Sequence, residues 1–358
     1  MKYRVNTFYA AAAEAADATV VIPINITDVI SQIVLEVRGL ATTVTNLAPI
    51  ARAITQIDVI DGSDVLFSLD GEQAEALDWY NNKGTFRANY NMMLTGNTAV
   101  RYIGINFGRY LYDPIYALDP KRFNNLQLRV TVDSGVGGNT SNSVTLAARA
   151  CVFETPPTEL RGFFMSKEFK QWTMAAATHN YCDLPLDYPY RALFFRAFLA
   201  GTETNQCVSN FKLSEDQDKK ILFDDDPWDL HTVLNSRLPK VSENYFFACS
   251  NLIRYLYVAA TTKVVANGTR WAGSALDANV SCYNGDGGRL DTYSYPAGQN
   301  YQIHVEGDLP HSVYMLPFGD INDPSDLYDV RNLGSLRTDI TGGAASQGYL
   351  FAQQVRSY

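Results

Sequence analysis

The amino-acid sequence predicts an all-β protein made of two tandem β-sandwiches of about eight strands, with one short helix inserted in each. Three observations predict this class: an aromatic-rich composition, a succession of short apolar segments separated by turn residues, and an internal duplication. Of the 358 residues, 46% are hydrophobic and 12% are aromatic, including 22 Tyr and 18 Phe. Such side chains suit the pleated, half-buried faces of sheets, and a chain of this length usually divides into two domains.

The duplication begins with a matched strand-like segment in each half. Residues 22–25 (IPIN) lead into an apolar run that ends at Gly39, and residues 184–187 (LPLD) lead into a second run that ends at Gly201. The proline and the glycine are sixteen positions apart in both halves. Equal spacing of the same residue types is the signature of a repeated structural unit.

The second correspondence is a strand followed by a short helix. Residues 65–70 (VLFSLD) and 221–226 (ILFDDD) are the matched strand segments. We expect helices over 71–82 and 227–235, because each strand segment ends in an aspartate that can cap a helix N-terminus. The second helix also has a proline at its first position, where a missing N–H group costs nothing.

A closing signature supplies the third correspondence. In each half an aromatic-glycine pair is followed by Asp-Pro and then by a segment containing Asn-Leu. In order, these segments are residues 105–108, 113–114 and 123–129 in the first half, and 316–319, 323–324 and 330–337 in the second. Three matched segments in one order are difficult to attribute to shared β composition alone.

The remaining elements are short strands and turns, with two departures. Alternation of apolar and polar residues over 126–132 indicates a half-buried strand, whereas the alanines within residues 8–18 favour a small N-terminal helix. Residues 163–172 (FFMSKEFKQW) are amphipathic and follow Pro156-Pro157, which breaks the last strand of the first half. We therefore expect, in order, an N-terminal arm 1–18, a first sandwich 19–160, a linker 161–178 and a second sandwich 179–358.

Charge and cysteine usage restrict the classes of partner. The net charge of −9 argues against a surface that neutralises phosphates, so we expect no direct contact with nucleic acid. The five cysteines show no metal-ligand spacing, and we expect reduced, mostly buried thiols: Cys151, Cys182, Cys207, Cys249 and Cys282. Residues 5–18 lack a strongly apolar core, so no signal peptide is expected, and no apolar window is long enough to span a membrane.

Together these features resemble the double jelly-roll capsid proteins of tailless viruses related to the tectiviruses, corticoviruses and adenoviruses. The resemblance covers nearly the whole chain. It rests on the duplication, on the helix at the equivalent place in each half, and on the closing signatures within residues 107–128 and 318–336. It implies an all-β fold of two tandem eight-stranded jelly-roll β-sandwiches, a double jelly roll, with one short helix inserted in each.

The resemblance also implies a function. The chain would be a structural virion protein, a major capsid protein whose homotrimers form pseudo-hexameric capsomers that tile an icosahedral shell. Its partners would be further copies of itself, minor capsid, penton or vertex proteins, and an internal membrane reached by the N-terminal arm, for which a frayed terminus is an equal alternative. Loops 135–142 and 264–299 would form outward towers. The protein would reside in the virion after assembly in the host cytoplasm.

A search for catalytic patterns favours no enzyme. The four histidines are not arranged as the paired ligands of a metal site: His179, His231, His304 and His311. The sequence contains no GxSxG nucleophile elbow. Residues 285–288 (GDGG) lack the Lys and Ser or Thr that complete a phosphate-binding loop. We therefore predict no catalytic, cofactor-binding or metal-ligating residues, and no cofactor.

Two groups of residues leave alternatives open. The acidic segment 224–226 is either a calcium site or a solvated turn that caps a helix. Trp79, Trp228 and Trp271 either stack on sugars or pack in the core. The alternative functions are accordingly a double-sandwich carbohydrate-active enzyme or amidase, which would need a pair of carboxylates, and a glycan-binding attachment protein.

Overall fold

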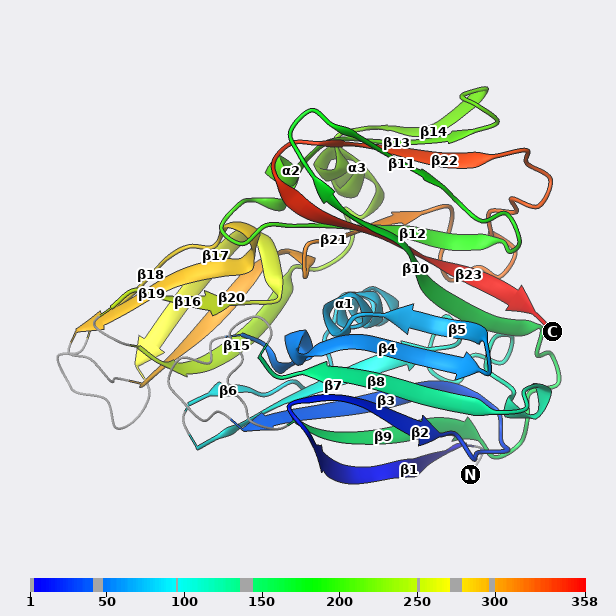
Figure 1. Ribbon diagram of the computed structural model, residues 1–358, viewed down its shortest axis with the longest axis horizontal. Helices are drawn as coiled ribbons and strands as arrows, with labels where there is room; N and C mark the ends of the chain where they lie inside the picture. The colour runs from blue at the N-terminus through cyan, green and yellow to red at the C-terminus, as the bar shows by residue number, and fades with distance from the viewer. Residues whose placement is uncertain are drawn as a thin grey trace.

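Two β-sandwiches lie one above the other, and a third β-rich body projects from one end of the pair (Figure 1). The structure is a computed structural model that describes residues 3–40, 48–94, 96–135, 144–249, 252–270, 279–295 and 300–358. The projecting body, here called the tower, comprises the described residues within 241–310 together with strand β6 (Asn91–Met93). Both ends of the chain lie on the side away from the tower (Figure 1).

The first sandwich consists of two four-stranded layers. In spatial order one layer is β1 (Tyr3–Glu14), β9 (Val144–Phe153), β3 (Ile30–Leu40) and β7 (Thr98–Asn106). The other is β2 (Asp17–Pro23), β8 (Leu126–Asp133), β4 (Ile54–Asp61) and β5 (Asp64–Leu69). Their inward-facing Ile, Leu, Val and Phe side chains form one continuous core, as expected of aligned sheets that bury one face each.

The second sandwich repeats the first strand for strand. One layer is β10 (Gly162–Met174), β23 (Ser346–Ser357), β12 (Tyr190–Phe198) and β21 (Val313–Pro317). The other is β11 (His179–Asp183), β22 (Leu336–Gly342), β13 (Val208–Glu215) and β14 (Lys220–Asp225). The matched segments 65–70 and 221–226 fall on β5 and β14, and the segments 22–25 and 184–187 lie at the end of β2 and directly after β11. The predicted duplication and the predicted eight strands in each half are therefore confirmed.

The duplication extends to single side chains. Asp61, the last residue of β4, accepts hydrogen bonds from the N–H groups of Asn124 and Asn125 at 3.1 and 2.6 Å. Asp216, in the turn between β13 and β14, accepts from the two residues that precede β22 at 2.7 and 3.0 Å. Asp61 and Asp216 thus bind the residues that lead into β8 and β22, which are equivalent strands of the two sandwiches.

Both predicted helices are present. α1 (Gly71–Asn81) begins with a capping box, in which the Asp70 carboxylate accepts from the Gln73 N–H at 2.6 Å and the Gln73 side chain accepts from the Asp70 N–H. α3 (Pro227–Leu234) begins at Asp226, which accepts from the Trp228 N–H at 2.7 Å. Shorter helical segments among the described residues include α2 (Thr204–Cys207) and the 3-10 segments η1 (Ile50–Ala53), η2 (Pro120–Arg122) and η4 (Asp286–Gly288).

The two sandwiches are joined by a parallel strand pair. β5, at the edge of the first sandwich, pairs with β10 of the second, with Phe67 opposite Ser166 and Ser68 opposite Lys167. This pair merges one layer from each half into an eight-stranded sheet. α1 lies in the angle between the sandwiches, close to the tower (Figure 1).

The tower is inserted between α3 and β21 and contains two sheets. One is β17 (Ala260–Arg270), β20 (Asn300–Pro310), β15 (Val241–Ala248) and β6. The other is β16 (Arg254–Tyr257), β19 (Arg289–Tyr295) and β18 (Asn279–Asn284). Residues 264–299 were expected to be a long loop, but most of their described part is strand. Of the loop expected at 135–142, only Gly135 lies within the described residues.

Two expectations about the segments that flank the first sandwich were wrong. Residues 8–18 form no helix: all but Ala15 and Ala16 belong to β1 and β2, which pair with β9 and β8. Cross-strand pairing along a sandwich edge here outweighs the modest helix preference of alanine. Residues 162–174, expected as a linker, form β10, which pairs with β23 along its length. The division of the chain near residue 160 stays a prediction.

The burial of the cysteines agrees with the sequence expectation. Four of the five cysteines are buried, and all five are free thiols. Among the described residues, no helix has the length and apolar character needed to cross a bilayer.

Candidate functional site

Buried charges gather around α1, where the two sandwiches meet the tower. Residues Gly71 to Tyr80 of this helix are all buried, and Glu72 and Glu75 are only 6% and 1% exposed. Buried carboxylates are tolerated when cations and hydrogen-bond donors surround them. We call this set the α1 junction; its members are Arg52, Asp70, Glu72, Glu75, Arg101, Arg196, Glu243 and His311.

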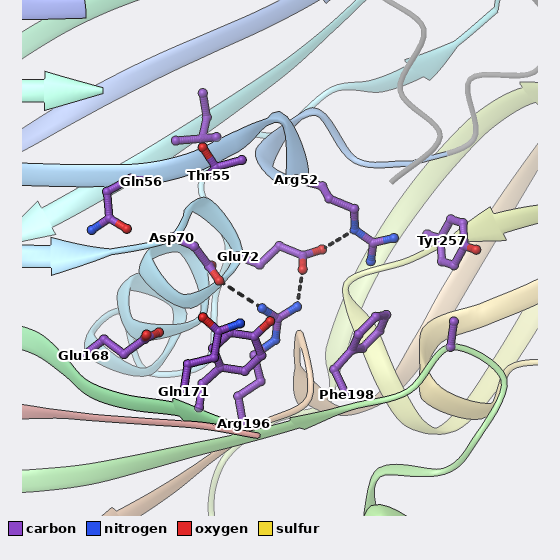
Figure 2. Close-up of a pocket in the computed structure, with 13 residues that line it drawn as sticks. Arg52, Thr55, Gln56, Asp70, Glu72, Glu168, Gln171, Arg196, Phe198 and Tyr257 are labelled. Carbon is purple, nitrogen blue, oxygen red and sulfur yellow. Dashed lines mark hydrogen bonds and ion pairs between the residues drawn. The ribbon is translucent and has the colours of Figure 1, made fainter. Parts of the chain in front are cut away.

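Glu72 connects the first sandwich to the second. Its Oε1 lies 2.8 Å from Nε of Arg52, which comes from η1, and its Oε2 pairs with Arg196 of β12. Arg196 also binds the helix cap, with its Nη1 3.0 Å from Asp70 Oδ2 (Figure 2). Burial works to raise the pKa of Glu72, but Arg52 and Arg196 hold that pKa well below its ordinary value. Glu72 is therefore a carboxylate clamped between two guanidinium groups.

Glu75 connects the same helix to the tower. Nη1 of Arg101, on β7, lies 2.8 Å from Glu75 Oε1 and 2.6 Å from Oε1 of Glu243, which belongs to β15. A second contact of 3.0 Å joins Arg101 Nη2 to Glu243 Oε2. Tyr245 donates its hydroxyl to Glu243 at 2.6 Å, and Asn89 donates to Glu75 at 2.8 Å. Arg101 is 0% exposed, so its charge is balanced by these carboxylates.

His311 completes the junction from the turn between β20 and β21. Its Nε2 lies 2.9 Å from Glu75 Oε2, and its Nδ1 lies 3.6 Å from Glu72 Oε1. Burial disfavours the charged imidazole, yet the contacts with Glu72 and Glu75 raise the pKa of His311 above its ordinary value. With His311 protonated, four cationic groups face four carboxyl groups. The junction is then neutral.

A cavity of about 520 Å³ adjoins the junction (Figure 2). Its charged lining includes Arg52, Arg196, Asp70 and Glu72, and Tyr257 is one of its aromatic residues. The guanidinium carbon of Arg52 lies 4.5 Å from the Tyr257 ring centroid, a cation–π contact. The cations at this cavity are thus already engaged by carboxylates and aromatic rings.

The α1 junction is suited to holding the surrounding elements in place rather than to catalysis. His311 could exchange a proton with Glu75, but its side chain is 1% exposed and it does not line the cavity. Removing one partner of a buried ion pair typically costs about 3–5 kcal/mol, because the remaining charge is left without compensation. The junction therefore sets how α1, β12 and the tower are held together.

The other three histidines lie on separate elements. His179 is on β11, with Nδ1 3.0 Å from Asp339. His304 is on β20, with Nε2 3.1 Å from Glu306. His231 is on α3, where burial lowers its pKa to about 4. Among the described residues no three His, Cys, Asp or Glu side chains form a group that could hold a metal ion.

The acidic segment 224–226 and two of the three tryptophans make contacts within the protein. Asp226 caps α3, and Asp224 accepts a hydrogen bond from Asn210 at 2.9 Å, as in the helix-capping alternative. Trp79 is 3% exposed within the core. Trp228 packs on His231 at a ring-centroid distance of 5.7 Å. Trp271 lies outside the described residues.

Sequence reasoning did not find the α1 junction. A signal was present, because Arg101 and Arg196 interrupt strands that are otherwise strongly apolar. Buried arginines in such runs require partners. Those partners lie far away in the chain; Arg101 and Glu243, for example, are separated by 142 positions. A single sequence does not indicate which distant carboxylate meets which arginine.

Comparison with known proteins gives matches at the level of structure. No protein-family model matches the sequence, and no curated protein matches it. Three solved structures are similar over nearly their whole length. They are the STIV major capsid protein (TM-score 0.59, 10% identity, 99% of this chain and 97% of that one), the major capsid protein P2 from bacteriophage PM2 (0.57, 12%, 99% and 98%), and a chain from the atomic structure of Sulfolobus Turreted Icosahedral Virus (0.61, 10%, 99% and 91%).

The chain has the double jelly-roll fold. The similarity covers both sandwiches, because it extends over 99% of the chain. At identities of 10 to 12% the likeness shows the fold alone, and a fold by itself does not determine a function. The predicted double jelly roll, with one helix inserted in each half, is confirmed.

Proposed function

We propose that this double jelly roll is a major capsid protein whose trimers form pseudo-hexagonal capsomers that tile an icosahedral shell. The observation that carries the proposal is the likeness along the whole chain to structures described as major capsid proteins, without a large unmatched part on either side. A shared fold alone permits other functions, so the molecule's own surfaces have to agree with the role.

The arrangement of the tower and the chain ends supports a building block with an outside and an inside. The tower stands at one end of the paired sandwiches, and both chain ends lie at the other (Figure 1). In a shell the tower would face outward, and the start of β1 would face the interior. An internal membrane and minor capsid, penton or vertex proteins are the partners we propose for that inner side.

The charge balance supports assembly through protein contacts. The net charge of −9 gives little attraction to phosphates, and we propose no direct contact with nucleic acid. The principal partner is instead the chain itself, first in the trimer and then in the lattice. We place the protein in the virion shell, after assembly in the host cytoplasm.

We also propose that the chain is not an enzyme. A carbohydrate-active enzyme or amidase would need a carboxylate or nucleophile presented to a cleft. At the cavity beside α1, Asp70 and Glu72 are bound by Arg196 and Arg52, so these carboxyl groups are occupied. A glycan-binding attachment protein is the other alternative, but Trp79 lies in the core and the half-buried Trp228 packs against His231.

Light scattering on the purified protein tests the proposal. Three chains of 39.8 kDa give a particle of about 120 kDa, and the capsid function predicts this mass over a broad concentration range. A species that remains at the mass of one chain even at high concentration would contradict the proposal. Incubating the protein with polysaccharides and assaying for released sugar would then test the enzyme alternative.

A further inference from the structure

Each sandwich has two lateral faces, and only one of them contacts the other sandwich of the same chain. We call the other lateral face of each sandwich its unused face. The first half contributes β5 and α1 to the contact between the sandwiches, and the second contributes β10 and β12. The counterparts of these elements are β14 and α3 in the second half and β1 and β3 in the first. β14 and β1 are edge strands of their sheets within the described part of the chain.

Matched hydrogen bonds define which residues of β5 and β14 are equivalent. Asp70 and Asp226 are the N-caps of α1 and α3, so they occupy the same position. Counting back along each strand, Phe223 and Asp224 correspond to Phe67 and Ser68. Phe67 and Ser68 are the residues of β5 that pair with β10.

The same reasoning relates β1 to β10 through the strands between them. Ile30 and Tyr190 begin β3 and β12 and form equivalent bridges, to Leu118 and Tyr328. Three positions further along, Ile33 pairs with Ala150 of β9 and Leu193 pairs with Ala352 of β23. Ala150 and Ala352 are therefore equivalent.

The equivalence then passes to the outer strands. Three residues beyond these alanines, Phe153 pairs with Tyr3 of β1, and Val355 pairs with Phe164 of β10. Tyr3 is thus the counterpart of Phe164. By the same count, Val5 and Asn6 are the counterparts of Ser166 and Lys167, the residues that pair with β5.

Exposure differs sharply between the used and the unused faces. Leu77 of α1 is 1% exposed, whereas its counterpart Val233 of α3 is 76% exposed. Ser166 of β10 is 0% exposed, whereas Val5 of β1 is 61% exposed. Apolar side chains thus stand in solvent on both unused faces. Exposed apolar groups clustered at strand edges are typical of surfaces that bind a partner.

Exposed charged groups of opposite sign occur on the two unused faces. On the second half, Asp224, Asp225 and Asp229 are exposed around β14 and α3. On the first half, Arg38 and Arg149 both pair with the buried carboxylate of Glu36, and their side chains are 43% and 33% exposed. A partner that carries both faces can satisfy both at once, and a second copy of this chain is such a partner.

We infer that neighbouring copies bind through these unused faces, in the way that the two halves bind within one chain. β14 and α3 of one copy would lie against β1 of the next, with Phe223–Asp224 parallel to Val5–Asn6. This contact joins two different faces, so it repeats from copy to copy until a ring closes. The number of copies, three, is taken from the proposed function. The inference adds which surfaces meet between copies and which residues of β14 and β1 lie opposite each other.

A paired cysteine experiment tests the register. In the double variant Asn6→Cys with Asp224→Cys, the two new thiols face each other only across the contact between copies. Directly opposed strand residues lie within the Cα separation that a disulfide requires. Mild oxidation should give covalent dimers and trimers on a non-reducing gel, whereas each single variant, with the five native cysteines, should remain monomeric on the gel.

Val21→Cys with Asp224→Cys is the matched control. Val21 is 49% exposed on β2, and its counterpart Tyr181 on β11 stays 51% exposed despite the contact between the halves. The face around Val21 should therefore remain uncovered between copies. Cross-linking of the control pair as efficient as that of the test pair would overturn the inferred register.

A second measurement is independent of cross-linking. Val5→Asp and Val233→Asp each place a charge on a side chain that is exposed in the single chain, so folding should be preserved. Each should weaken association by at least about tenfold, because a buried charge must be desolvated in the contact. Val21→Asp should leave association unchanged.

The outcomes separate this inference from the proposed function. A wild-type chain that does not associate would refute the capsid assignment itself. A stable trimer that neither cross-links through Asn6→Cys and Asp224→Cys nor responds to Val5→Asp and Val233→Asp would overturn the inferred contact while leaving the assignment in place.

Discussion

The two inserted helices, α1 and α3, began as the same element and now have opposite environments. Each follows an edge strand and starts at an aspartate cap, Asp70 or Asp226. α1 is buried and carries carboxylates that bind both sandwiches and the tower. In α3 only Pro227 is buried, and Val233 is exposed. The difference shows that neighbours, rather than local sequence, determine what an inserted helix does.

The largest effect should come from breaking the charge pairs of α1. Arg101→Met leaves Glu75 and Glu243 buried without their shared cation, and should lower the free energy of unfolding by about 3–5 kcal/mol. Urea denaturation followed by tryptophan fluorescence measures this loss. The counterpart of Glu75 on α3 is His231, and His231→Gln at pH 7.5 should cost far less. Similar losses for the two variants would mean that the two helices are not energetically different.

Shortening an apolar side chain should have the next largest difference in effect between α1 and α3. Leu77→Ala removes a buried side chain and should cost about 2–5 kcal/mol, through lost burial and a residual cavity. Val233→Ala, at the equivalent position of α3, should change the stability of the dissociated chain by no more than about 0.5 kcal/mol. Both values follow from unfolding below the concentration at which copies associate. A large loss in the dissociated Val233→Ala chain would contradict its exposure.

Removing the N-cap aspartate should destabilise α1 and α3 by amounts that differ less. Asp226→Ala removes one hydrogen bond at the start of α3 and should cost about 1 kcal/mol. Asp70→Ala should cost about 2 kcal/mol, because a reciprocal capping box and a charge-assisted contact with Arg196 are lost together. Hydrogen exchange of the amides in the first turn of each helix reports the loss locally. Equal protection changes would show that the capping box and Arg196 add nothing.

The smallest effects should appear as pH dependences of opposite sign. The pKa of His311 is raised, so its contribution is complete below the unfolded value of about 6.5 and is lost as pH rises through the raised pKa. The pKa of His231 is lowered to about 4, so its contribution is present above about 6.5 and is lost as pH falls toward 4.

Melting temperatures between pH 4.5 and 8.5 measure both contributions. Relative to wild type, His311→Gln should be most destabilised at low pH, and His231→Gln should gain stability as the pH falls from 6.5. Parallel curves for the two variants would mean that these histidines titrate as they do in the unfolded chain.

Features encoded by nearby residues could be predicted from the sequence. Asp70 and Asp226 identified the two helices, since a cap lies next to the helix it starts. The equal spacing from Pro23 to Gly39 and from Pro185 to Gly201 identified equivalent strands. These signals were sufficient for the double jelly roll and for its duplication.

Features that depend on distant partners were missed. The alanines of β1 favour a helix locally, but the edge of β9 is available to pair with them. β10 has the amphipathic pattern of a connecting segment, yet it pairs with β23, which lies more than 170 positions further along the sequence. The α1 junction unites Arg101, Glu243 and His311 from three parts of the sequence. Neither local propensity nor spacing contains that information.

Electron microscopy of the purified protein would test the proposed trimer, because it shows both the number of copies and how the halves meet. The proposed assembly predicts compact particles of three chains, seen along their axis as six similar lobes in a pseudo-hexagon. Each contact between copies should resemble the contact between β5 and β10 within a chain. Isolated two-lobed particles at all concentrations, or a symmetric dimer joined through the towers, would contradict it.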